Sequence, residues 1–191
     1  MAHLQGKGPA PSNPMVRLSE SVEATDTFDG LAAWLRPVAD GLLRLPLSRE
    51  VLRGDWLGHA VHPLMTDLPI GFWTSANVLD LVGGEQTRPA AQLLTGLGVA
   101  SAVPTAVTGL AEWGGLRTER DRRTGTAHAV GNTVALGCFA GSWLARRRGR
   151  WATGVALGLV GASAATVAGY LGGHLATARR VGTRHPAFED D

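Results

Sequence analysis

The chain contains very little cysteine, lysine and charge. Of its 191 residues, one is cysteine, one is lysine and 18% are charged. The single cysteine, Cys138, excludes an internal disulfide, a cysteine-rich zinc site, a haem attached through C-x-x-C-H and a cysteine-ligated iron–sulfur cluster within this chain. Because Cys138 lies inside an apolar run, we predict that it is a small packing residue.

The low charge favours a membrane protein over a nucleic-acid-binding one. Soluble domains average about 25% charged residues, whereas 45% of this chain is apolar and its net charge is only +2. Most arginines lie beside apolar runs, which is typical of topology determinants rather than of a nucleic-acid-binding face. Residues 1–20 have no apolar core of a signal peptide, so we expect the first span to direct membrane insertion.

Four long apolar runs predict four membrane-spanning helices. They cover about residues 64–83, 90–111, 126–145 and 151–176, and a span needs about 20 residues. A soluble bundle would need polar outer faces, for which the last three runs offer few charges. The predicted fold class is therefore all-α: an integral membrane four-helix bundle preceded by an amphipathic surface helix. Pro69 lies inside the first span and requires a neighbouring helix to satisfy the carbonyl group that it frees.

The remaining segments divide the chain into regions. Residues 1–26 predict a disordered N-terminal tail, and residues 179–191 a C-terminal tail. Residues 27–57 contain the amphipathic helix, with Trp34 at headgroup depth; the alternative is a helix packed on the protein's own polar face. The four-span domain occupies residues 58–178. The apolar residues of the surface helix recur at helical spacing: Leu31, Trp34, Leu35, Val38, Leu42 and Leu45.

Four of the six histidines fall at one side of the predicted bundle. In four antiparallel spans, the starts of the first and third meet the ends of the second and fourth. Ionisable residues at such positions are costly, and they mark functional sites by default. We therefore predict a shared site; the alternative is that these histidines only form hydrogen bonds. This side carries His59, His62, His128 and His174, together with Asp67, Glu112, Asn132 and Tyr170.

Imidazole ligates haem iron and several other transition metals. A b-type haem would take two opposed histidines from His62, His128 and His174, with His59 as a further candidate. A non-haem metal ion would add the carboxylates of Asp67 and Glu112. Asn132 and Tyr170 would orient the imidazoles from a second layer. A proton path is a third interpretation, and the spacing does not choose among them because the residues come from different helices.

The histidines belong to a combination of motifs: G-H-x-x-H-P-x-x-x-x-x-P-I-G from Gly58, then His128 and Asn132, and finally G-Y-L-G-G-H-L ending at Leu175. This combination resembles an uncharacterised bacterial four-helix membrane domain of unknown function, found alone or fused to Rieske-type iron–sulfur domains. The resemblance covers about residues 50–178. The usual family form is G-H-P-x-H-P, and here Ala60 replaces the first proline. The resemblance carries over His59, His62, Pro63, Pro69, His128, Asn132, Gly172, Gly173 and His174, and its fusion partners imply a redox setting.

These observations lead to one expected function and its rivals. We expect a multi-pass membrane protein that binds haem or a metal and passes electrons to or from a partner, Rieske-type or cytochrome, rather than an enzyme. Its other partner would be the lipid bilayer, with no nucleic acid. The rivals are a structural or assembly subunit without cofactor, and a small transporter or proton conductor.

Arginine counts predict the topology. The side of the termini and histidines has eleven arginines near the spans and the other side has five. The larger count should face the cytoplasm, which places both termini on the cytoplasmic side of the cell membrane. The cluster Arg146–Arg150 favours the opposite orientation.

Overall fold

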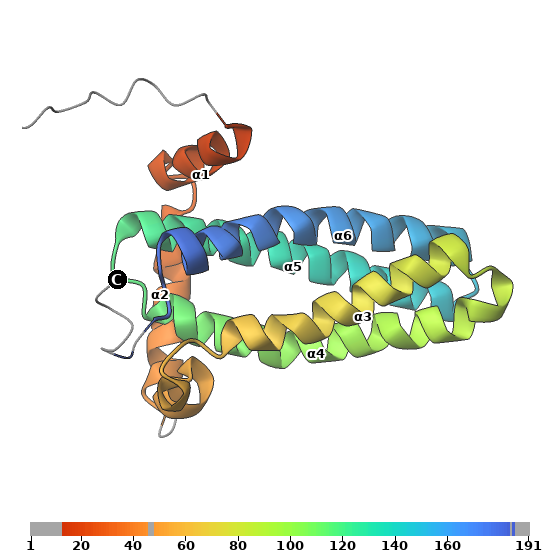
Figure 1. The fold of residues 1–191 in the computed structure, drawn as a ribbon, viewed down its shortest axis with the longest axis horizontal. Coiled ribbons are helices and arrows are strands. Elements are labelled where there is room, and N and C mark those ends of the chain that lie inside the picture. The colour runs from red at the N-terminus through yellow and green to blue at the C-terminus, as the bar shows by residue number, and fades with distance from the viewer. Residues whose placement is uncertain (1–12, 46–47, 184, 186–191) are drawn as a thin grey trace, which may run out of the picture.

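The computed structural model describes residues 13–45, 48–183 and 185. Four long helices form an antiparallel bundle (Figure 1): α3 (His62–Val82), α4 (Arg88–Gly114), α5 (Glu119–Arg147) and α6 (Trp151–Gly173). Two helices precede it, α1 (Pro14–Ala24) and α2 (Asp29–Leu43). The short helices are η1 (Ser48–Leu52), η2 (Asp55–Leu57), η3 (Glu85–Thr87) and η4 (His174–Ala178). The predicted all-α four-helix bundle with a preceding helix is confirmed.

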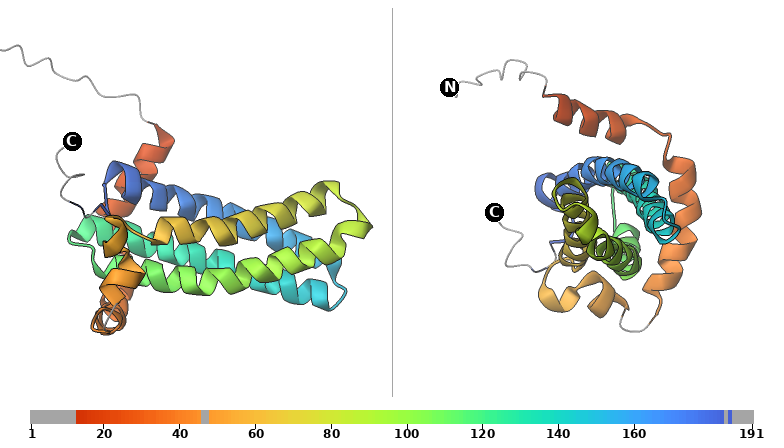
Figure 2. Two further views of the ribbon diagram at one scale, coloured as in Figure 1. Left: turned by 60° about the horizontal axis from the view of Figure 1, so that its bottom comes forward. Right: turned by 90° about the vertical axis from the view of Figure 1, so that its right-hand side faces the viewer.

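The two ends of the bundle differ, and we name them by their residues. The histidine end contains the starts of α3 and α5 and the ends of α4 and α6. The arginine end contains the turn at residues 83–87 and the turn at residues 148–150. Residues 14–45 and 48–57 wrap around part of the histidine end as a collar, in which α2 runs across the bundle rather than along it (Figures 1 and 2).

Local sequence explains how the bundle helices begin and continue. The Thr118 side chain caps α5 by accepting a hydrogen bond from the Asp121 amide at 3.1 Å, and Arg146 and Arg147 suit its C-terminal dipole. In α3, Pro69 frees the carbonyl group of Met65, and Thr105 of α4 donates its hydroxyl to that oxygen at 3.1 Å. The requirement predicted for Pro69 is thus met.

The segment predicted to be disordered contains a helix. The Asn13 side chain accepts a hydrogen bond from the Met15 amide at 2.9 Å, and Pro14 occupies the first turn of α1. These are standard signals for a helix start, which the segment's overall composition obscured. Residues 1–12 lie outside the described part of the chain.

The helix α2 has one face on the protein and one face outside. Ala39, with Ala32 and Leu35 beside it, packs against Trp113 and Leu116. On another face Leu31, Trp34 and Val38 are exposed, Trp34 to 68%. The packed face agrees with the alternative interpretation, a helix packed on the protein itself. That the exposed apolar face lies on a membrane stays a prediction.

A salt bridge and a further hydrogen bond from Arg123 hold the collar against the bundle. Arg123 of α5 donates to the Asp29 carboxylate at 2.9 and 2.7 Å and to the main-chain oxygen of Glu23 at 3.3 Å. The hydrogen bond from Arg123 holds the pKa of Asp29 below its usual value.

Part of the predicted C-terminal tail pairs with the segment before α3. His59 and Thr183 form an antiparallel β-bridge. The Ala60 amide donates to the Gly182 oxygen at 2.9 Å, and the His185 amide donates to the Gly58 oxygen at 3.1 Å. Arg179 also donates to the carboxylate of Asp121 at 2.8 Å. Residues 179–183 and 185 are therefore held against the bundle by hydrogen bonds.

The hairpins α3–α4 and α5–α6 present equivalent residues to the centre of the bundle. Three pairs from α3 and α5, each 66 residues apart, meet there: His62 with His128, Trp73 with Phe139, and Asp80 with Arg146. On α4 and α6, glycines 63 residues apart lie against these rings: Gly98 and Gly161 beside the Trp73–Phe139 layer, Gly109 and Gly172 beside the histidines. The bundle thus has an approximate twofold axis along its length, which the sequence analysis did not anticipate.

Two of the described helical segments are long and apolar enough to cross a membrane. They are Glu85–Gly114, which contains α4, and Trp151–Ala178, which contains α6. The helices α3 and α5 are also long, but they carry the polar residues of the axis, and α5 begins with a charged turn.

Candidate functional site

His62 and His128 face each other at the histidine end of the bundle. Their ring centroids are 6.1 Å apart and their planes are perpendicular, at 89°. His62 begins α3 and His128 lies in α5, so the pair joins the two hairpins across the axis. Both side chains are partly buried.

Each imidazole is fixed by the second helix of its own hairpin. The His62 Nδ1 lies 3.0 Å from the Thr105 main-chain oxygen and 3.2 Å from the Thr108 hydroxyl. The His128 Nδ1 lies 2.7 Å from the Ala168 main-chain oxygen. A carbonyl oxygen only accepts, so we assign the proton to Nδ1 in both rings. Each Nε2 is then left with a lone pair, the form in which histidine ligates a metal.

Two glycines make room for the rings. A Cβ atom at Gly109 would lie 2.8 Å from the Cε1 atom of His62. A Cβ atom at Gly172 would lie 2.6 Å from the Cε1 atom of His128. Any side chain at these positions would displace the imidazole. Gly172 was among the residues implied by the family resemblance, whereas Gly109, Thr105 and Ala168 were not predicted. The signal for them is the eleven-residue spacing that recurs from Gly98 to Gly109 and from Gly161 to Gly172.

Asn132 makes the site asymmetric. Its side-chain amide nitrogen lies 3.0 Å from the His128 Nε2, so the predicted contact between these two residues is present. The equivalent position in α3 is Thr66, whose hydroxyl donates to the Pro63 oxygen at 2.6 Å instead. An amide group therefore caps the lone pair of only one imidazole.

The structure does not bring the four predicted histidines together. His174 pairs with Glu23 of α1, with 2.9 Å between Nε2 and the carboxylate oxygen. Tyr170 donates its hydroxyl to the Met15 oxygen at 2.7 Å. Both residues thus face α1 rather than the axis. His59 is exposed beside the β-bridge. These residues lie at one end of the bundle because each is close to a helix end. They do not meet because each helix is rotated so that their side chains point in different directions.

The two predicted carboxylate ligands also lie elsewhere. Asp67 is exposed. Glu112 forms an ion pair with Arg53 at 3.7 Å. Across the described residues, no group of three histidine, cysteine, aspartate or glutamate side chains is placed to hold a metal ion.

A family profile described as "Predicted membrane protein (DUF2231)" matches residues 58–185. The chain belongs to the DUF2231 family. It matches no curated protein and no solved structure. The DUF2231 match contains α3 to α6 and the β-bridge, whereas the collar precedes it. Both axis histidines therefore belong to the DUF2231 domain, and Glu23, the partner of His174, does not.

A buried ion pair closes the arginine end of the DUF2231 bundle. Arg146 donates to both carboxylate oxygens of Asp80, at 2.7 and 2.5 Å, and each side chain is only 1% exposed. Its Nε also donates to the Ser142 hydroxyl at 3.2 Å, and its guanidinium lies 4.7 Å from the Trp151 ring. Between the two ends, Trp73 and Phe139 stack 4.1 Å apart.

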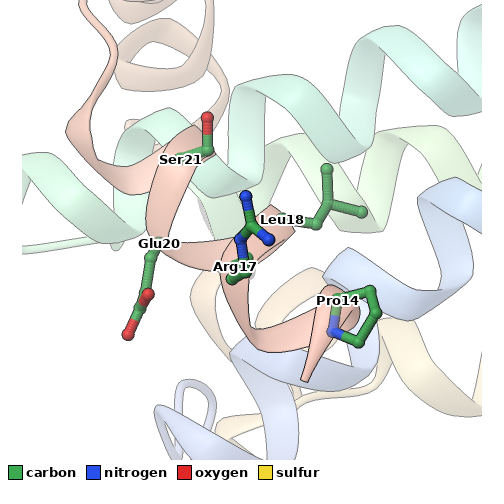
Figure 3. Close-up of a pocket in the computed structure, with 5 residues that line it drawn as sticks. All are labelled: Pro14, Arg17, Leu18, Glu20 and Ser21. Atoms are coloured by element: carbon green, nitrogen blue, oxygen red, sulfur yellow. The ribbon is translucent and has the colours of Figure 1, made fainter. Parts of the chain in front are cut away.

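Two hollows adjoin α1, outside the bundle axis. One, of about 590 Å³, is lined by Pro14, Arg17, Leu18, Glu20 and Ser21, all from one helix (Figure 3). Its groups do not converge from different elements. The other, of about 300 Å³, lies between α1, the end of α6 and η4, beside His174 and Tyr170. The axis histidines line neither hollow.

Proposed function

We propose that this DUF2231 protein is a multi-pass membrane component that binds b-type haem iron between His62 and His128 and passes electrons to or from a partner protein. The observation that carries the proposal is the pair of opposed imidazoles. Each has its Nδ1 hydrogen-bonded to a main-chain carbonyl, which leaves the lone pair on Nε2. This arrangement is typical of metal-ligating histidines.

The number of donors favours haem iron over a bare ion. A tetrahedral ion needs four ligands, but the carboxylates of Asp67 and Glu112 lie elsewhere and no third ionisable ligand joins the pair within the described residues. Haem iron already has four nitrogen ligands from its own macrocycle and takes axial ligands such as histidine from the protein. Two opposed imidazoles are therefore a sufficient donor set.

The surroundings of the two rings leave space for them at the axis. Gly109 and Gly172 make room for the imidazoles, whose ring centroids lie 6.1 Å apart. The Asn132 amide lies 3.0 Å from the His128 Nε2, so Asn132 would have to turn away for that nitrogen to ligate iron.

When bound, haem supplies one-electron oxidation and reduction. The chain's own residues would set its position and its basicity: the Thr105 and Ala168 oxygens fix each ring and make its Nε2 a stronger donor. The electron partner would be a Rieske-type protein or a cytochrome, as the resemblance implies.

The direction of the apolar helices supports a multi-pass topology. Both α4 and α6 begin at the arginine end and finish at the histidine end. If both cross the membrane in the same direction, α5 must return the chain between them. Several outward residues of α3 are apolar too, with Leu64, Leu68 and Ile70 about half exposed, although Asp67 between them is exposed as well. We place the histidine end and both termini in the cytoplasm, following the arginine count.

Reporter fusions test this topology. A reporter that is active only outside the cytoplasm, fused after residue 191, should stay inactive. The same reporter inserted in the turn at residues 148–150 should be active. The reverse pattern would invert the proposed orientation, and activity at both positions would show that α6 does not cross the membrane.

Haem binding is tested on protein purified in detergent after expression with added haem precursor. The parent should show a Soret band, sharp α bands on reduction and about one haem per chain. His62→Ala and His128→Ala should each lose almost all haem, and the double variant should resemble either single because both ligate one centre. His174→Ala, a matched control at the same end of the bundle, should keep it.

Other outcomes favour the rivals. A parent without haem or metal, under conditions where both were supplied, would contradict the redox function and favour a structural subunit. Stoichiometric metal without haem would favour the non-haem site. Proton flux into vesicles that depends on His62 and His128, again without haem, would favour a proton conductor.

A further inference from the structure

The arginine end carries more positive charge than the entire chain. Its basic residues are Arg88, Arg146, Arg147, Arg148 and Arg150, and its acidic residues are Asp80 and Glu85, which gives +3 against +2 for all 191 residues. Both acidic residues are already engaged. Asp80 binds Arg146 inside the bundle, and Glu85 binds Arg88 at 2.8 Å. The described part of this end therefore offers no acidic partner for Arg147, Arg148 and Arg150.

These three arginines lie around one exposed turn. Gly149 has a φ of 71°, a left-handed conformation that favours glycine. A Cβ atom there would meet nothing within 4 Å, so the turn stands clear of the bundle. Arg147, Arg148 and Arg150 are all exposed. Both α4 and α6 also begin at this end, which adds the positive ends of two helix dipoles.

Tryptophans lie directly beside this charge. The Arg147 guanidinium lies 4.9 Å from the Trp143 ring, and that of Arg88 lies 5.4 Å from the Trp151 ring. Trp143 also packs against Gly96, where a Cβ would lie 2.7 Å from the indole nitrogen. Tryptophan is enriched where a membrane helix meets the headgroups. The turn therefore lies at the depth of lipid phosphates if α5 and α6 cross the bilayer.

We infer that the turn at residues 148–150, with Arg147 and Trp143, binds the headgroups of anionic phospholipids. The chemistry is that of exposed guanidinium groups without acidic partners, a form that binds phosphate oxygens well, held beside apolar rings that suit acyl chains. Arginines close to a membrane surface that carries anionic lipid are attracted to it by about 1 kcal/mol per residue, or roughly fivefold in affinity. The inference rests on the proposed membrane topology, which puts this end at the leaflet opposite the cytoplasm, and it is independent of haem binding.

The test is lipid binding by the full-length protein in detergent, measured by native mass spectrometry with phosphatidylglycerol, phosphatidylcholine or inorganic phosphate added. The parent should bind phosphatidylglycerol at least about 10-fold more tightly than phosphatidylcholine. The triple variant Arg147→Gln, Arg148→Gln, Arg150→Gln should lose this preference. The matched control Arg117→Gln, Arg120→Gln, Arg180→Gln removes the same charge from exposed positions at the histidine end and should keep it.

Three results would overturn the inference. They are equal binding of the two lipids by the parent, an equal loss of preference in the control variant, and full displacement of lipid by millimolar inorganic phosphate, which would indicate a site for free anions. Because the substituted residues are exposed, unchanged melting of both variants would show that the fold is intact. The haem content, measured on the same samples, should not change.

Discussion

The hairpins α3–α4 and α5–α6 place residues at equivalent positions, yet the two ends of the bundle use those positions differently. At the arginine end the facing residues are complementary, because Arg146 and Asp80 satisfy each other. At the histidine end they are identical, and each imidazole is hydrogen-bonded through Nδ1 to its own hairpin. Two such imidazoles do not satisfy each other. The proposed function places the haem at this layer, where both hairpins contribute the same residue.

The largest expected effect comes from breaking the buried ion pair between Arg146 and Asp80. Arg146→Ala should destabilise the protein by about 3–5 kcal/mol, because it leaves the Asp80 carboxylate buried without its partner. For a chain of this size that lowers the melting temperature by roughly 6–20 °C. Thermal unfolding in detergent measures it.

A double variant separates the loss of the pair from the loss of packing. Asp80→Leu with Arg146→Met removes both charges and should recover most of the stability. If Arg146→Ala melts like the parent, the two hairpins are not joined through this layer, and the comparison of the two ends fails.

Adding a side chain at Gly172 or Gly109, where glycine leaves room for a histidine ring, should have the next largest effect. Gly172→Ala places a Cβ 2.6 Å from the Cε1 atom of His128, which should displace the ring, destabilise the protein by about 1–3 kcal/mol and reduce haem content. Gly109→Ala should act alike on His62, since the hairpins are equivalent. Melting temperature and haem per chain measure both effects.

The matched control for Gly172→Ala is Gly169→Ala, which lies in α6 as well. A Cβ at Gly169 meets nothing within 4 Å, and alanine favours a helix by about 1 kcal/mol, so stability should stay equal or rise. The small residues Gly161, Ala165, Gly169 and Gly173 recur every four residues in α6, but they do not pack as one surface. Gly161 meets Phe139, whereas Gly169 and Gly173 face open space.

The smallest expected effect lies in the asymmetry between the hairpins. Asn132→Ala removes the amide that occupies the His128 Nε2. Because this frees the lone pair for iron, it should strengthen haem binding by roughly 2–10-fold, the worth of one hydrogen bond. Thr66→Ala, at the equivalent position, should change it little, because Thr66 bonds to its own helix. Haem titration of the apoprotein measures both, and equal effects would show that Asn132 has no special role.

Local patterns predicted most of the bundle but less of the site. Four apolar runs gave four helices, and a four-residue spacing placed Asn132 against His128, because these depend on helical periodicity. The partner of His174 could not be predicted from local patterns, because Glu23 is 151 residues away in the chain. It also lies in α1, a helix in a segment whose composition predicted disorder. Pairing across the axis depends on the rotation of each helix. The 66-residue offset shared by the three α3–α5 pairs can be found in the sequence, but only by aligning the first hairpin with the second.

The β-bridge between His59 and Thr183 has a consequence for how this domain can be connected. It brings the segment that enters α3 within main-chain hydrogen-bonding distance of the segment that leaves η4. A short peptide could join these two segments without moving a helix, which is the geometry that permits circular permutation. New termini opened at the exposed Gly149 should then be tolerated. For the same reason, a module fused to either end of the domain would arrive at one place, beside the opposed histidines.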